Sequence, residues 1–173
     1  TASKILSFRR GPLFSADKVV KELYQNQKFI TLIGKKFEIK KKHSIKKYLK
    51  KIILENKSNI KKLEKIIHPL VRKKMKDFTL RNRKQKLLFY EIPLLIESKL
   101  NKYFDIVIFI KTKKRLRLKR FMLKNGDRNL FNLLNSKQMV DKKKIKFCDY
   151  IVVNEKNLSF LKKKLSIIIS NYV

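Results

Sequence analysis

The chain has few residues that could form covalent or metal-mediated cross-links. Its 173 residues include one cysteine, Cys148, and two histidines, His43 and His68. A single cysteine excludes an internal disulfide, and one cysteine with two histidines does not form the ligand pattern of a zinc site. These features predict a reducing, cytoplasmic setting.

Long apolar runs and chain-breaking residues are also scarce. No apolar run is long enough to span a bilayer, and residues 1–10 lack the apolar segment of a secretory signal. We therefore expect no membrane partner. The sequence holds only three glycines and three prolines, and no Gly/Ser-rich or Pro-rich linker divides it. Because 43% of the residues are hydrophobic, we expect one compact folded domain.

Acidic residues are outnumbered: 13 Asp and Glu face 47 Lys and Arg, which gives a net charge of +34. Such a charge raises the prospect of a basic RNA-binding or ribosome-associated protein. However, 38 of the basic residues are Lys and 9 are Arg, and they are spread along the whole chain. Arg is the better residue for bidentate phosphate recognition, so a chain rich in Lys is less suited to it. Biased codon usage would enrich Lys without any selection for RNA binding. We therefore expect no specific nucleic-acid partner.

Hydrophobic spacing predicts alternating helices and strands. From 58 to 83 the apolar residues recur at helical spacing, with a break near Pro69, which lacks an amide donor, so that a kink or a new helix start is expected at His68-Pro69. Short apolar runs without polar alternation, typical of strands buried on both faces of a parallel sheet, lie between further helical stretches. Strands that alternate with helices indicate an α/β fold. The predicted strands are 87–92, 105–110 and 149–153, and the other predicted helices are 1–10, 112–124, 128–147 and 157–171, with short helices and loops over 28–55.

Several short motifs could carry chemistry. Asp17 follows the short extended piece Leu13-Phe14, and ligands of parallel α/β sheets bind beyond the carboxyl ends of strands. The competing interpretation is that Asp17 only complements the dipole of the helix that starts there. His68 precedes a mid-helix proline, although most lone helical histidines are structural. The segment 93–97 follows a predicted strand. A basic helix precedes Gly126, although such a run of charge is more commonly a solvated helix face.

Together, these motifs resemble those of the dephospho-coenzyme A kinase family over essentially the whole chain. The resemblance is carried by five ordered segments. They are Arg10 to Asp17 followed by Glu22-Leu23-Tyr24; Leu63 to Arg72; Pro93 to Glu97 with Phe104 to Ile110; Arg120 with Lys124-Asn125-Gly126; and Gln138, Lys144, Cys148-Asp149 and Asn154.

The resemblance implies a three-layer P-loop kinase-like parallel sheet flanked by helices, with a helical lid. It also implies transfer of the ATP γ-phosphoryl group, with Mg²⁺, to the 3′-hydroxyl of dephospho-coenzyme A. The expected single domain 1–173 has a core of about 1–27, 84–111 and 148–173, a helical acceptor-binding part of about 28–83 and a lid of about 112–147. Another nucleoside-type kinase of this fold is the nearest alternative.

The resemblance also implies roles for single residues. Asp17 would be the catalytic carboxylate that accepts the proton of the ribose hydroxyl. The acceptor side would be lined by Tyr24, His68, Arg72, Pro93, Leu95 and Glu97. The ATP and lid residues would be Thr1, Arg120, Lys124 and Asn154.

Some family features are missing from the sequence. Ser15 stands where the family has an aspartate, and Lys124 stands where it has a second lid arginine. No G-x-x-x-x-G-K-[S/T] phosphate loop occurs in the 173 residues. We expect this loop, its Mg²⁺-binding Ser or Thr and the first, central strand of the sheet to lie upstream of Thr1. No metal ligand is therefore expected within this chain, and the 173 residues alone are expected to be inactive as a kinase.

Overall fold

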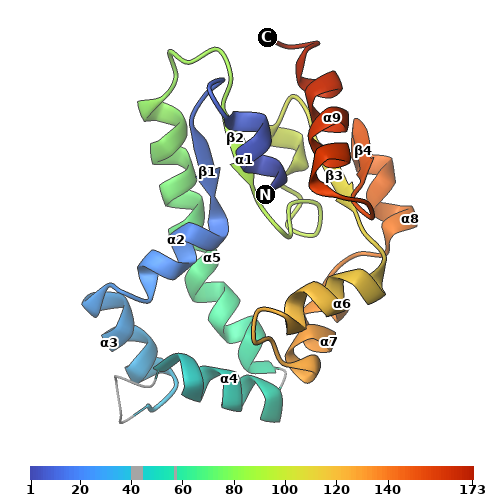
Figure 1. Ribbon diagram of the computed structural model, residues 1–173. Helices are drawn as coiled ribbons and strands as arrows, with labels where there is room; N and C mark the ends of the chain where they lie inside the picture. Colours follow the sequence, from blue (N-terminus) through green and yellow to red (C-terminus); the bar gives the residue numbers. More distant parts are fainter. Residues whose placement is uncertain (40–44, 57) are drawn as a thin grey trace. The chain divides into compact units, whose positions relative to one another are not determined.

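The structure is a computed structural model that describes residues 1–39, 45–56 and 58–173. It divides into two compact units, each described here by itself (Figure 1). The middle unit is Phe14–Glu91, and the terminal unit joins Thr1–Leu13 to Ile92–Val173. The predicted acceptor-binding part falls within the middle unit and the predicted lid within the terminal unit, while the division into functional parts stays a prediction. His43 lies outside the described residues.

In the middle unit, helices pack on a small two-stranded sheet. Strand β1 pairs with β2, and the ring of Phe14 from β1 lies 5.6 Å from that of Phe78. Tyr90 of β2 meets the same Phe78 ring edge-on at 5.5 Å. These tilted and edge-on ring pairs hold the strands against helix α5. The elements are β1 (Leu13–Ser15), α2 (Ala16–Leu23), α3 (Gln27–Lys36), α4 (Ile45–Glu55), α5 (Ser58–Arg81) and β2 (Phe89–Glu91).

Helix α5 runs through Pro69 as one continuous helix, so the predicted new helix start there is wrong. A proline inside a helix removes one hydrogen bond and crowds the preceding turn. Here both halves of the helix are held by packing: Ile60 and Leu63 are buried in the first half, and Phe78 joins the aromatic cluster in the second. The packing of the two halves offsets the single lost bond.

The terminal unit contains a parallel strand pair covered by helices (Figure 1). Strand β3 pairs with β4 in parallel, from Ile108 opposite Tyr150 to Lys111 opposite Val153. Helix α9 packs on β4 and on α1 and contributes the fully buried Leu165. The elements are α1 (Ala2–Ser7), η2 (Asn101–Tyr103), β3 (Ile108–Lys111), α6 (Lys114–Met122), α7 (Arg128–Ser136), α8 (Asp141–Lys144), η3 (Ile145–Phe147), β4 (Tyr150–Val153) and α9 (Leu158–Ile169).

The α/β class and the parallel pairing of β3 with β4 are confirmed. The strand near 87–92 instead pairs with β1, so the described residues form two separate two-stranded sheets. Burial on both faces was expected for every strand, but β4 exposes 44% of Ile151 and 47% of Val153 while burying Val152. The predicted helix 128–147 is interrupted between α7 and α8 by a link, residues 137–140.

Short polar side chains fix where several helices begin. A side-chain oxygen accepts a hydrogen bond from the free backbone amide three residues later, which stabilises the first turn. The four caps are Ser15 to the Lys18 amide, Asn26 to the Phe29 amide, Asp127 to the Leu130 amide and Asn157 to the Phe160 amide.

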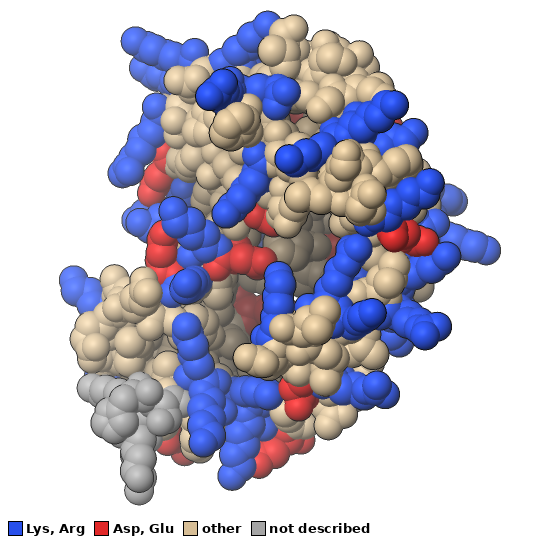
Figure 2. Space-filling model, in the orientation of Figure 1, with Lys and Arg blue, Asp and Glu red and all other residues tan. Residues whose placement is uncertain are grey.

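The surface carries the basic excess of the sequence. Figure 2 shows Lys and Arg side chains scattered over the visible face, with no single stripe of positive charge. No helix within the described ranges is both long and apolar enough to cross a membrane.

Candidate active site

In the middle unit, two carboxylates lie near the ends of β1 and β2. Ser15 ends β1 and caps α2, which places Asp17 in the first turn of that helix, while Glu91 is the last residue of β2. Although Asp17 reaches the solvent, loss of hydration raises the pKa of its carboxyl, and the negative charge of Glu91 raises it further. A carboxylate with a raised pKa is a stronger base than an ordinary aspartate.

The predicted acceptor-side residues of the middle unit lie on α2 and α5. Tyr24 is the C-cap residue directly after α2, with its ring edge-on to Phe29 at 5.3 Å and the Lys46 ammonium 5.2 Å from its centre. Burial raises the pKa of the Tyr24 hydroxyl. His68 and Arg72 are four residues apart on α5, so they share one helical face, with His68 half-buried and Arg72 exposed.

In the terminal unit, polar groups gather where β3 and β4 end. The Asn154 amide donates to the Lys111 carbonyl at 2.8 Å. The Asn154 carbonyl accepts from Thr112 Oγ1 and from Arg120 Nη1 of α6, each at 3.3 Å. Two of the predicted ATP-side residues, Arg120 and Asn154, are therefore in direct contact at the carboxyl end of the strand pair, where ligands of α/β proteins bind.

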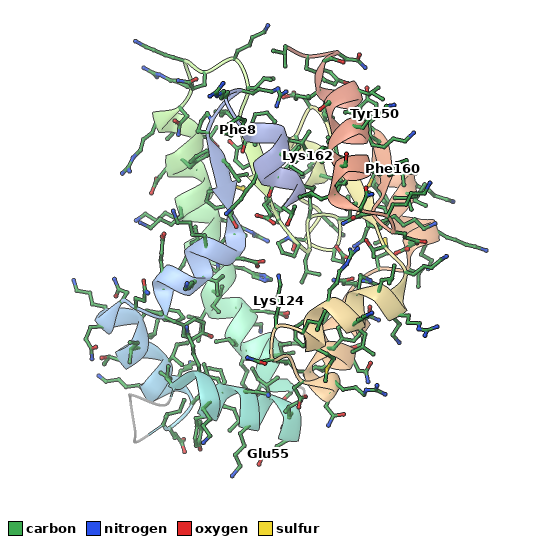
Figure 3. All side chains as sticks on the ribbon, viewed as in Figure 1. Phe8, Glu55, Lys124, Tyr150, Phe160 and Lys162 are labelled. Carbon is green, nitrogen blue, oxygen red and sulfur yellow. The ribbon has the colours of Figure 1, made fainter. Side chains whose placement is uncertain are left out.

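Lys124 and Gly126 lie in the turn after α6, and Lys124 is labelled in Figure 3. Lys124 is exposed, and the Gly126 amide donates to the Phe121 carbonyl at 3.1 Å. A Cβ atom at position 126 would overlap the Phe121 ring and carbonyl, so only glycine fits this turn. Thr1, the remaining predicted ATP-side residue, is exposed and precedes α1.

A hollow of about 490 Å³ opens beside this strand end, and one of its lining residues is Arg117, which no sequence motif indicated. Arg117 Nη1 donates to Gln138 Oε1 at 2.6 Å. The buried Arg117 Nε and Asn135 Oδ1 atoms have no hydrogen-bond partner among the described residues. The spacing of Arg117 and Arg120, one helical turn apart on α6, could have revealed the pair. The hollow is lined by Lys111, Thr112, Arg117, Asn135, Gln138 and Val153, among others.

Glu97 lies in the turn that follows Pro93 and Leu95, in the terminal unit. Its Oε1 atom is 2.9 Å from Lys144 Nζ, and both side chains are nearly buried, 14% and 10% exposed. The Met139 amide donates to the same oxygen at 2.8 Å. Burial alone would raise the pKa of Glu97, but the hydrogen bonds from Lys144 and from the Glu97 and Met139 amides, with the charge of Lys144, leave it lowered.

The predicted residues are thus shared between the units. Asp17, Tyr24, His68 and Arg72 belong to the middle unit. The terminal unit contains Thr1, Pro93, Leu95, Glu97, Arg120, Lys124 and Asn154. Their convergence on one cleft, and the substrate contact expected of each, stay predictions.

A family model and two curated relatives of this chain carry the same activity in their names. The dephospho-CoA kinase family model matches residues 1–159. A dephospho-CoA kinase of Bartonella quintana is 34% identical over 166 residues, covering 92% of this chain and 84% of its own length. One from Fusobacterium nucleatum is 30% identical over 170 residues, covering 95% and 88%.

One solved structure carries the same activity in its name, and another shows the same fold. A dephospho-CoA kinase from Campylobacter jejuni superimposes with a TM-score of 0.62 at 28% identity, covering 92% of this chain and 84% of that one. The Thermus thermophilus protein TT1252 shares the fold, with a TM-score of 0.75 at 20% identity and coverage of 99% and 93%. The chain belongs to the dephospho-CoA kinase family.

Proposed function

We propose that this protein is a dephospho-coenzyme A kinase, which transfers the γ-phosphoryl group of ATP to the 3′-hydroxyl of dephospho-coenzyme A. The observation that carries the mechanism is Asp17, a carboxylate beyond the end of β1 whose pKa is raised by lost hydration and by Glu91. Phosphoryl transfer depends on positioning and charge stabilisation more than on covalent chemistry. Asp17 can position the acceptor hydroxyl as a base, and the cations Arg120 and Lys124 can stabilise the phosphoryl charge.

Asp17 orients the ribose hydroxyl and takes its proton as the new phosphate ester bond forms and ADP leaves. On the acceptor side, Tyr24, His68 and Arg72 bind the coenzyme part, together with Pro93, Leu95 and Glu97. On the nucleotide side, Arg120 and Lys124 stabilise charge on the transferred group, with Asn154 near the base and Thr1 near the phosphates. The hollow beside Asn154 receives the nucleotide, and Arg117 is one of its lining cations.

Magnesium accompanies ATP in such transfers and neutralises the phosphate charge. The part of the chain that the structure describes contains no group of three or more His, Cys, Asp or Glu side chains that could hold a metal ion. Magnesium at such sites is held mainly by the phosphates, with one or two protein oxygens. Its protein ligand would be the Ser or Thr of a G-x-x-x-x-G-K-[S/T] loop, a motif that does not occur in the 173 residues.

The experiment is a phosphoryl-transfer assay with dephospho-coenzyme A on two proteins. One is the 173-residue chain, and the other carries a Gly-x-x-x-x-Gly-Lys-Ser strand and loop ahead of Thr1. We expect turnover from the second protein only, because the loop amides and its lysine hold the phosphates. Turnover by the short chain at a normal kinase rate of about 1–100 s⁻¹ would contradict this requirement.

In the active protein, Asp17→Asn should lower kcat by about 10²–10⁴-fold with little change in ATP affinity, because the carboxylate acts on the hydroxyl. Glu22→Gln is the matched control, since this carboxylate lies on the same helix and forms only an exposed ion pair with Lys18 at 3.9 Å. Equal losses of kcat and ATP affinity in Asp17→Asn would instead make Asp17 a structural first-turn carboxylate. The cytoplasmic location stays a prediction.

A further inference from the structure

The carboxylate of Glu97 is held inside the terminal unit by groups from elsewhere in the chain. Lys144, at the end of α8, and the Met139 amide both bind the same oxygen, at 2.9 and 2.8 Å. The Lys144 ammonium also lies 5.4 Å from the centre of the Phe109 ring on β3. A carboxylate buried in this way is stabilised only while its partners stay in place, so it fixes their positions in return.

Met139 belongs to the link 137–140 between α7 and α8, and such links are held only by the contacts they make. The residue before it, Gln138, accepts the hydrogen bond from Arg117 at 2.6 Å. Adjacent residues of one short link are therefore tied at two points, one through a backbone amide to Glu97 and one through a side chain to Arg117.

Arg117 is the cationic end of this chain of contacts. Arg117 is one of the residues that line the 490 Å³ hollow, and its buried Nε atom has no hydrogen-bond partner among the described residues. A guanidinium has five N–H donors, so one that is fixed through Nη1 keeps other donors that suit a ligand acceptor. The orientation of the Arg117 guanidinium depends on Gln138 staying in place.

We infer that Glu97 is a positioning residue: through the Met139 amide it fixes the link 137–140, and through Gln138 it sets the orientation of Arg117 in the hollow. This differs from the acceptor contact that the family resemblance implies for Glu97. The relay itself does not depend on which ligand fills the hollow, whereas its effect on ATP rests on the proposed function.

The first test needs no ligand or activity and uses the ¹⁵N-labelled 173-residue chain. Solvent exchange of the Arg117 Nε proton and the Met139 amide is followed by NMR. In Glu97→Ala both rates should rise roughly ten- to a hundredfold, because the link loses its anchor. Glu97→Gln keeps an acceptor for the Met139 amide and should stay within about threefold of the parent protein. Asp105→Asn, an exposed acid of the same unit, is the control.

Gln138→Ala separates the relay from general loosening. It should free Arg117 while leaving the Met139 amide protected, and the Val152 amide should keep its protection in every variant. If Glu97→Ala deprotects Met139 but leaves Arg117 unchanged, Glu97 is a structural anchor only and the inference is wrong. If Glu97→Ala does not fold, the double variant Glu97→Ala with Lys144→Met removes the same anchor without leaving a buried lysine unpaired, and it takes the place of Glu97→Ala in the comparison.

The second test uses the protein that carries the phosphate loop. Glu97→Ala should raise KM for ATP by roughly tenfold while KM for dephospho-coenzyme A changes less than about twofold. A larger rise in KM for dephospho-coenzyme A than for ATP would instead show that Glu97 acts on the acceptor side. Absence of kinase activity in the parent protein would count against the proposed function, while the NMR comparison would still decide on the relay.

Discussion

Replacing Asp149 should loosen the strand pair that carries the nucleotide-side residues. Asp149 Oδ2 accepts a hydrogen bond from the Val107 amide at 2.7 Å, and the Asp149 amide donates to the Val107 carbonyl at 2.9 Å. Val107 is only 8% exposed. Asp149→Ala therefore leaves a buried amide without its charged acceptor, which costs about 1.5–3 kcal/mol. Asp149→Asn keeps a neutral acceptor and should cost about half as much.

The assay is urea unfolding followed by circular dichroism, with thermal unfolding as a check. For a chain of this size, about 2 kcal/mol lowers Tm by about 4–8 °C. Asp105→Ala, an exposed aspartate two residues before Val107, is the matched control. If Asp149→Ala and Asp105→Ala differ by less than about 0.5 kcal/mol at equal m-value, the side chain does not hold the strand start and the reasoning is refuted.

Three further predictions concern the base, the lid turn and the surface charge. Glu91→Gln removes a charge that raises the pKa of Asp17, so Asp17 should stay ionised to lower pH. The acidic limb of the kcat/KM profile should therefore shift to lower pH, whereas an unshifted limb would show that another group titrates there. Gly126→Ala forces a methyl group into Phe121 and should destabilise the protein by about 1–3 kcal/mol in thermal unfolding, whereas Asn129→Ala nearby serves as the neutral comparison. Binding to RNA or DNA, measured by anisotropy, should be indifferent to sequence and should fall steeply between about 50 and 200 mM salt; tight, selective binding at physiological salt would favour a nucleic-acid role.

The sequence predicted those elements whose signal is local. Apolar spacing located α5 and α9, and the apolar runs near 105–110 and 149–153 correspond to the parallel pair β3 and β4. The start of β3 was misplaced because it depends on a side chain from elsewhere in the chain. The Val107 amide donates to the Asp149 side chain and so is not paired with a neighbouring strand. Strand β3 therefore begins only at Ile108.

The site was predictable where a motif named a residue and not where a distant contact defined its role. Asp17, Arg120 and Asn154 were found by resemblance, and the last two are in contact. Lys144 also belongs to the resembling motifs, but it is one of three consecutive lysines, and nothing local shows that this one is buried against Glu97. Arg117 was missed for the same reason, because its partner Gln138 is on the link beyond α7.

The continuity of α5 has a mechanical consequence. At 24 residues it is a rod about 36 Å long, supported near one end by packing with α4 and near the other by the Phe14 and Tyr90 rings. His68 and Arg72 lie near mid-span, next to Pro69, where the ladder of backbone hydrogen bonds lacks one rung. A displacement of either packed end would therefore bend helix α5 most easily beside His68 and Arg72, the two side chains proposed to hold the acceptor.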